Sequence, residues 1–154
     1  MRTVLIIALF AAGCVPTTGN WKMNPEKSKH GDSESFPQSL VMSIEPYPEY
    51  EAVTVWRVTE DGRSETESFI LRFDGQDHPH PQQDRFESFN ARRLPDGTTE
   101  VLYKKAGKVV AREVRQVNNN GRQMTIQSGF YSRAGTWLER VLVFEKQRKA
   151  EGVE

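Results

Sequence analysis

Residues 96–121 read DGTTEVLYKKAGKVVAREVRQVNNNG, and this stretch decides the fold. Turn pairs at Asp96-Gly97, Ala106-Gly107 and Asn120-Gly121 bound two short runs that are rich in valine and other strand-forming residues. Asp-Gly and Asn-Gly between such runs are strong hairpin signals, because glycine accepts the positive φ that tight turns need. The stretch therefore predicts antiparallel strands joined by tight turns, with further strands on both sides.

The same pattern of short runs and turn signals continues in both directions, without sustained helical periodicity between residues 38 and 147. The clearest runs are Ser39–Glu45, Ala52–Thr59, Ser64–Phe73, Phe86–Leu94, Thr98–Lys104, Lys108–Val117, Gln123–Phe130 and Thr136–Lys146. An up-and-down sheet leaves two edges unless it closes. We therefore expect an all-β fold, a single antiparallel up-and-down β-barrel of roughly eight or nine strands.

The N-terminus carries a second informative stretch. Arg2 precedes an apolar run over residues 4–10, small residues follow, and then comes Cys14, the only cysteine of the chain. A positive residue, a short apolar run and small residues before the cut are typical of a secretory signal peptide. The stretch resembles a bacterial lipoprotein leader, in which the cysteine becomes the acylated first residue of the mature protein.

The resemblance to a lipoprotein leader implies how the chain is divided into segments and where in the cell the protein is located. The parts are a signal peptide at residues 1–13, a lipidated tether at 14–19, a barrel domain at 20–147 and a polar tail at 148–154. Acyl chains such as palmitate on Cys14 would make the membrane a partner, because two or more chains anchor a protein stably. Val15 stands where an inner-membrane lipoprotein often has Asp, so we expect the bacterial outer membrane, facing the periplasm. Ordinary cleavage near Ala12, without lipidation, is the alternative.

A second resemblance begins at Gly19-Asn20-Trp21, which is similar to the Gly-x-Trp opening of lipocalins and related calycins. The run Tyr103–Val110 also resembles bacterial secreted lipoproteins with a lipocalin-like domain. In lipocalins the tryptophan closes one end of the barrel, and an arginine of the last strand packs across it. Arg140 interrupts an otherwise apolar strand face, so the resemblance implies that Arg140 is the partner of Trp21.

Large side chains on the strands are candidates for lining a ligand-binding interior. They are Trp56, Phe69, Phe73, Phe86, Tyr103 and Met124. A barrel of about eight strands has room for packed side chains or for one small ligand. The first function hypothesis is therefore a binder of a small apolar ligand, without a cofactor. The second is a structural or interaction lipoprotein of the envelope, with unknown protein partners, in which these residues are ordinary core.

The chain carries few signs of catalysis. His78 and His80 lie in a polar loop with Asp77 and Asp84, and the two histidines are weak candidates for holding a divalent cation. A metal-dependent enzyme is therefore the third hypothesis, against a plain loop stiffened by proline. No nucleophile elbow, zinc-protease motif or phosphate-binding glycine loop occurs, so no catalytic residue is assigned and an enzyme is not favoured. The 21 basic and 21 acidic residues balance, which argues against nucleic acid as a partner.

Overall fold

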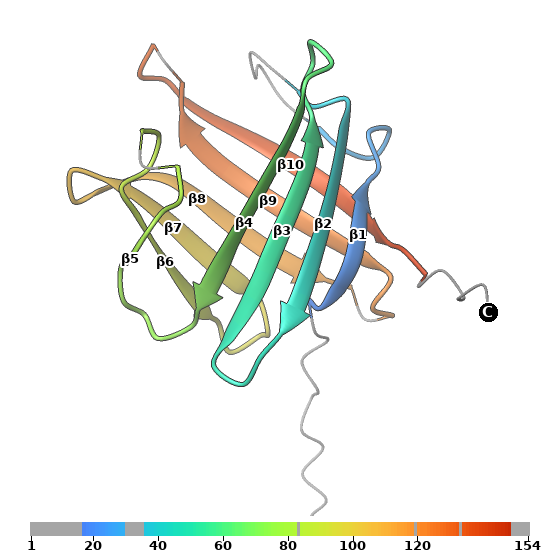
Figure 1. Cartoon of the computed structure of the whole chain (residues 1–154), viewed down its shortest axis with the longest axis horizontal. Coiled ribbons are helices and arrows are strands. Elements are labelled where there is room, and N and C mark those ends of the chain that lie inside the picture. The colour runs from blue at the N-terminus through green and yellow to red at the C-terminus, as the bar shows by residue number, and fades with distance from the viewer. Residues whose placement is uncertain (1–16, 30–35, 83, 119, 133, 149–154) are drawn as a thin grey trace, which may run out of the picture.

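The computed structural model describes residues 17–29, 36–82, 84–118, 120–132 and 134–148. These residues form one antiparallel sheet that curls into a barrel (Figure 1). Its ten strands are β1 (Gly19–Met23), β2 (Ser39–Pro46), β3 (Tyr50–Val58), β4 (Ser64–Arg72), β5 (His78–Pro79), β6 (Ser88–Arg93), β7 (Thr99–Lys105), β8 (Lys108–Val117), β9 (Gln123–Tyr131) and β10 (Trp137–Lys146). Consecutive strands pair with each other except β4 and β5, and β1 also pairs with β10. The expected all-β up-and-down barrel is confirmed.

The sheet has ten strands in place of the eight or nine expected. The two additional strands are short: β1 inserts between β2 and β10, and β5 is a two-residue strand that pairs with β6. β5 is too short to show the alternation of apolar and polar residues by which a strand is found in a sequence, and the five residues of β1 are near the lower limit. No helix with the length and hydropathy to span a bilayer occurs among the residues that the structure describes.

The hairpin between β7 and β8 is a two-residue turn. Its central residues, Ala106 and Gly107, have φ values of 49° and 72°. Two positive φ values are typical of a type I′ turn, whose twist matches that of the flanking strands. Glycine adopts this conformation freely, whereas the Cβ of alanine makes it strained. Ala106 is therefore a point of local backbone strain at the tip of this hairpin.

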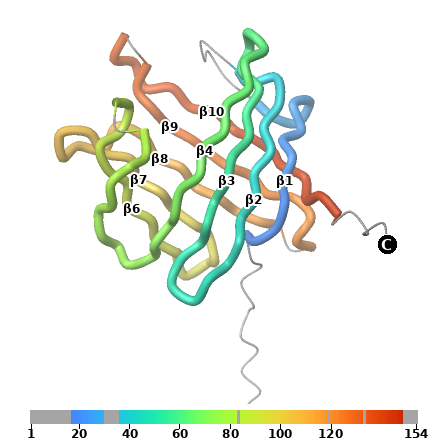
Figure 2. Tube along the Cα trace, viewed as in Figure 1, coloured from blue at the N-terminus to red at the C-terminus, as the bar shows by residue number. Residues whose placement is uncertain are grey.

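The core lies inside the barrel. The tube view shows β1 to β4 crossing over β7 to β10, so the sheet folds over onto itself (Figure 2). Alternate residues of each strand point inward, as the two-residue period of a β-strand requires. The most deeply buried apolar side chains are Trp21, Ile44, Val53, Leu71, Val101, Met124, Ile126 and Phe144.

The seam of the barrel is filled by rings. The strands β4 and β5 are the two edges of the sheet, so no ladder of backbone hydrogen bonds closes it. Phe69 of β4 packs edge-to-face on Phe89 of β6, with 6.0 Å between ring centroids. His80 contacts both rings, at centroid distances of 6.3 and 5.5 Å. Aromatic contacts of this kind stabilise the seam where backbone pairing is absent.

Candidate ligand-binding cavity

The barrel encloses a space of about 120 Å³. The apolar part of its wall includes Leu40, Met42, Val55, Phe69, Phe86, Ile126 and Phe144. The space shares lining residues with a wider depression of about 970 Å³ at one end of the barrel. We call this end, at which Arg57, Arg85, Phe130 and Arg140 line both spaces, the mouth. Ligand sites usually measure about 300–1,000 Å³, so the inner space alone is small and the mouth supplies most of the room.

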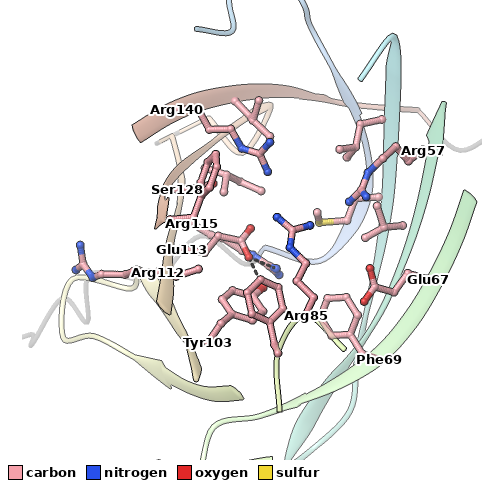
Figure 3. A pocket seen from close by; sticks show the side chains of 18 of the residues that line it. Arg57, Glu67, Phe69, Arg85, Tyr103, Arg112, Glu113, Arg115, Ser128 and Arg140 are labelled. Carbon is pink, nitrogen blue, oxygen red and sulfur yellow. Dashed lines mark hydrogen bonds and ion pairs between the residues drawn. The ribbon is translucent and has the colours of Figure 1, made fainter. Parts of the chain in front are cut away.

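Three arginine side chains converge at the mouth (Figure 3). Arg57 lies on β3, Arg140 on β10, and Arg85 in the segment between β5 and β6. On β3 the alternation places Arg57 on the same face as the buried Val55. On β10 it places Arg140 on the same face as the buried Leu142. Both charges are therefore directed inward by the same strand geometry that buries the core.

The arginines of the mouth differ in their partners. The Nη1 atom of Arg57 lies 3.6 Å from Oε2 of Glu65. Arg85 forms no ion pair with another described residue, and its guanidinium carbon lies 5.0 Å from the ring centroid of Phe86. Arg85 is therefore held by a cation–π contact that leaves its charge without a counter-ion in the described part of the chain.

Arg140 is a partly buried arginine of the mouth. Its guanidinium carbon lies 5.3 Å from the ring centroid of Phe130, and it forms no ion pair with any residue that the structure describes. Its Nε atom is buried and has no hydrogen-bond partner there. Burial lowers the pKa of Arg140, the charge of Glu113 raises it, and the like charges of Arg57 and Arg85 lower it. The mouth thus gathers positive charge around a buried donor.

A second polar cluster lies deeper in the barrel. The hydroxyl of Tyr103 donates a hydrogen bond to Oε2 of Glu113, and Nη2 of Arg115 lies 3.5 Å from the same oxygen. Burial and the Glu113 charge raise the pKa of Tyr103 well above its ordinary value. Burial opposes the charge of Arg115, yet Glu113 raises the net pKa of this arginine. Glu113 is therefore the counter-ion of Arg115 and already has two partners.

The residues expected to line the cavity lie in different places. Phe69, Phe86 and Tyr103 line it. Met124 is fully buried in the core but does not reach the cavity. Phe73 lies outside the cavity lining, and the guanidinium carbon of Arg93 stands 4.3 Å from its ring centroid.

The expectation for Trp56 is wrong. This side chain is 45% exposed and lies on the outer face of β3. Val53 and Val55 occupy the inner face of the same strand, so the two-residue period turns Trp56 outward.

The expected contact between Trp21 and Arg140 is also wrong. In the β1–β10 register Trp21 pairs with Lys146, which lies six residues beyond Arg140. Six residues span roughly 20 Å along a strand, so Arg140 cannot reach the tryptophan. The Nζ atom of Lys146 stands 5.3 Å from the Trp21 ring centroid. A lysine therefore takes the place that the resemblance assigned to an arginine, and Arg140 is at the mouth.

The end opposite the mouth is plugged by side chains. We call it the closed end and define it by Thr17, Trp21, Glu51 and Arg93. Trp21 is fully buried and its Nε1 donates to the carbonyl of Thr17 at 2.7 Å. Glu51 is 2% exposed and accepts hydrogen bonds from Arg93 and, at 2.9 Å, from Oγ1 of Thr17. The predicted signal peptide and Cys14 lie outside the described residues.

His78 and His80 have separate partners. The Nε2 atom of His78 lies 2.9 and 3.0 Å from the two carboxylate oxygens of Asp74. His80 is buried among rings, accepts a hydrogen bond at Nδ1 from the backbone N–H of Gln82, and has Nε2 3.7 Å from Glu67. Burial lowers the pKa of His80, and Glu67 partly opposes this. Among the described residues no group of three His, Cys, Asp or Glu is placed to hold a metal ion.

The sequence interpretation missed most of the charges in the cavity. They are Arg57, Glu67, Arg85, Arg112, Glu113 and Arg115. Except for Arg85 and the exposed Arg112, each stands at an inward position of a strand, on the same face as buried apolar residues. A charge at such a position is the signal that could have found them, because buried charges are uncommon without a purpose or a partner. Arg85 lies on a connecting segment, where no alternation predicts its direction.

Comparisons with known proteins support the fold. No family model matches the chain, and no curated protein matches it in sequence. The zebrafish ileal bile acid-binding protein, solved with cholic acid, has a TM-score of 0.51 and 10% identity over 84% of this chain and 98% of that chain. The siderocalin Ex-FABP gives a TM-score of 0.47 and 8% identity, over 87% of this chain and 72% of its own. Lobster apocrustacyanin A1 gives 0.45 and 9%, over 87% and 63%. The first of these similarities, together with the sheet topology, shows a lipocalin-like fold.

Proposed function

We propose that the protein is a lipid-anchored bacterial lipoprotein whose lipocalin-like barrel binds a small apolar ligand. The cavity carries this proposal, because a space inside the barrel, with apolar and charged residues in its wall, opens into a wider depression at the mouth. Sites for small molecules are usually concave and mostly apolar, with a few polar groups that orient the ligand. The similarity in fold to a bile acid-binding protein that was solved with cholic acid supports the same proposal.

The position of Thr17 gives the proposed anchor a direction. Thr17 is buried at the closed end and follows Cys14 by three residues, so the tether has almost no free length. Glu51, which binds Thr17, and Arg57 at the mouth lie near opposite ends of β3. With Cys14 acylated, the closed end faces the bilayer and the mouth opens away from it. We place the protein at the outer membrane, with the mouth open to the periplasm.

Mass spectrometry of the full chain, produced with its own leader and extracted from bacterial membranes, tests the anchor. We expect a mature N-terminus at Cys14 that carries acyl chains, and loss of this species in Cys14→Ser. A serine at this position cannot form the thioether of a lipoprotein, so that variant is the matched control. An unmodified N-terminus at another residue would contradict the anchor.

Native mass spectrometry of the same preparation tests the ligand. We expect an adduct of a small apolar molecule that extraction with organic solvent removes. Calorimetry with decanol then measures whether the emptied barrel takes up an apolar chain. Absence of an adduct together with absence of decanol binding would overturn the ligand-binding function.

A second candidate is a structural or interaction lipoprotein of the envelope with a filled barrel. The small inner space, about 120 Å³, favours it, because core side chains occupy most of the interior. This candidate predicts that neither decanol nor an anionic analogue binds, and that protein partners are recovered by cross-linking in membranes.

A further inference from the structure

We propose that the ligand is a small amphiphile with an anionic head, that Arg57, Arg85 and Arg140 hold this head at the mouth, and that its apolar part enters the cavity. This inference rests on the proposed ligand-binding function and adds the chemical class and the direction of the ligand. Three guanidinium groups from separate elements point toward one another in the same opening (Figure 3). A guanidinium group is planar and has several N–H donors, so three of them can surround one carboxylate or phosphate.

Among the described residues, buried donors without a hydrogen-bond partner occur at Arg115, deeper in the barrel, and at Arg140, which is the one at the mouth. The Nε atom of Arg140 is buried and without a hydrogen-bond partner in the described part of the chain, although the residue carries a charge. A buried charged donor is unfavourable unless a partner satisfies it. The chain brings two further positive charges, those of Arg57 and Arg85, close enough to act on Arg140. An anion at this place would satisfy the donor and remove the repulsion between like charges.

The acidic groups nearby are engaged elsewhere. Glu113 accepts from Tyr103 and faces Arg115 at 3.5 Å. Oε1 of Glu67 lies 3.7 Å from Nε2 of His80, and Oε2 of Glu65 lies 3.6 Å from Nη1 of Arg57.

Two further carboxylates, those of Glu60 and Asp84, line the outer depression. Neither forms an ion pair with the three arginines in the described part of the chain. The described residues therefore leave the charges of Arg85 and Arg140 without a counter-ion.

The apolar wall below the arginines sets the direction of the ligand. Leu40, Arg57 and Arg140 line both the inner space and the mouth, whereas Met42, Val55 and Ile126 line only the inner space. The inner space, about 120 Å³, is below the roughly 300 Å³ at which ligand sites usually begin. It therefore accepts a short apolar segment, and the rest of the ligand occupies the mouth. The head stays near water, which limits the desolvation of its charge.

Isothermal calorimetry of the full chain with decanoate, decanol and inorganic phosphate tests the inference. Decanoate and decanol have the same chain and differ in the charge of the head. We expect decanoate to bind at least about tenfold more tightly than decanol, because hydrogen bonds to charged groups contribute most to such a difference. Inorganic phosphate, which has no apolar part, should bind much more weakly than decanoate.

Variants at the mouth test which arginines bind the anionic head of the ligand. Arg140→Gln should remove most of the preference for decanoate and leave the affinity for decanol within about threefold, because only the charged contact is lost. Arg57→Gln should also reduce the preference for decanoate over decanol, and it serves as the test variant if Arg140→Gln does not fold. The matched control is Arg63→Gln in the exposed β3–β4 turn, outside the cavity lining, which should leave both affinities unchanged.

The outcomes are distinguishable. Equal binding of decanoate and decanol, unchanged by the mouth variants, would overturn the anionic head while the proposed apolar ligand stands. Binding of neither would overturn the proposed function as well. Binding of inorganic phosphate as tightly as decanoate would show a site for a free anion and overturn the amphiphile.

Discussion

The two ends of the barrel use the same chemistry to different effect. At the closed end Arg93 binds the buried carboxylate of Glu51 and packs on Phe73. At the mouth Arg140 packs on Phe130, but the described residues include no carboxylate that binds it. The two arginines share a cation–π contact and differ in the counter-ion.

This difference in counter-ions assigns a stabilising role to the arginine of the closed end and a ligand-binding role to the arginine of the mouth. A paired charge that plugs the closed end contributes to the fold, since Glu51 is almost fully buried and needs its partner. An unpaired charge at the mouth does not stabilise the empty barrel and is explained by a ligand that completes it. Natural proteins commonly keep such unfavourable groups at functional sites. Substitution of the two arginines by the same residue should therefore act in opposite directions.

The largest expected effect is at the closed end. Arg93→Met leaves the carboxylate of Glu51 buried without its cation, and we expect the free energy of unfolding to fall by about 3 kcal/mol. Urea denaturation measures it. Arg92→Met is the matched control, because Glu100 then keeps Arg112 as a partner at 2.6 Å. Equal losses in the two variants would show that the Glu51 pair has no special role.

The next effect has the opposite sign. Arg140→Met removes a partly buried charge that has no counter-ion in the described structure and puts an apolar side chain against Phe130. We expect the free energy of unfolding of the empty barrel to rise by about 1 kcal/mol. The same denaturation experiment measures it. A loss as large as that of Arg93→Met would mean that Arg140 is a structural residue.

A third prediction concerns pH and the ring cluster at the seam. Burial lowers the pKa of His80 below its ordinary value of 6.5, so the folded state favours the neutral ring. The stability from this group is complete above pH 6.5 and is lost as the pH falls toward the lower pKa of the folded state. We expect a loss below about 1 kcal/mol between pH 7.5 and 5.5, measured by urea denaturation.

His80→Gln should reduce this loss, because glutamine does not titrate in this window. Asp77, whose pKa the hydrogen bond from Lys104 lowers, titrates below this window. An unchanged pH dependence in His80→Gln would contradict the assignment.

The smallest expected effect is a change in stability from relieving backbone strain near the mouth, without a change in ligand affinity. Ala106 has positive φ in the β7–β8 hairpin, whose residue Lys105 lines the mouth. Asn is preferred at this position of a type I′ turn, so Ala106→Asn should raise the free energy of unfolding by about 0.5 kcal/mol. Thermal denaturation measures the shift, and decanoate affinity should stay the same. A decrease in stability would show that the turn is not strained.

The sequence predicts the tight turns and the inward or outward direction of strand residues. It misses the contacts that depend on which residues of two strands pair. The turns at Gly97, Gly107 and Gly121 are found, because a glycine between two strand-forming runs marks a tight turn without reference to the rest of the chain. The inward direction of Arg140 is also visible in the strand alternation. Its partner is not, since that depends on the pairing of β1 with β10, two segments at opposite ends of the chain. The presence of a counter-ion distinguishes the closed end from the mouth. Whether an arginine has one also depends on the pairing of strands that are distant in the sequence.

One measurement tests the central claim that the mouth, and not the closed end, holds an anionic ligand. It is the increase in the free energy of unfolding that saturating decanoate produces in Arg140→Met, compared with Arg93→Met. At about a hundred times the dissociation constant, a ligand of the folded state adds about 2.7 kcal/mol. The account predicts that Arg93→Met keeps this increase and that Arg140→Met loses most of it. An equal increase in both variants would contradict the claim.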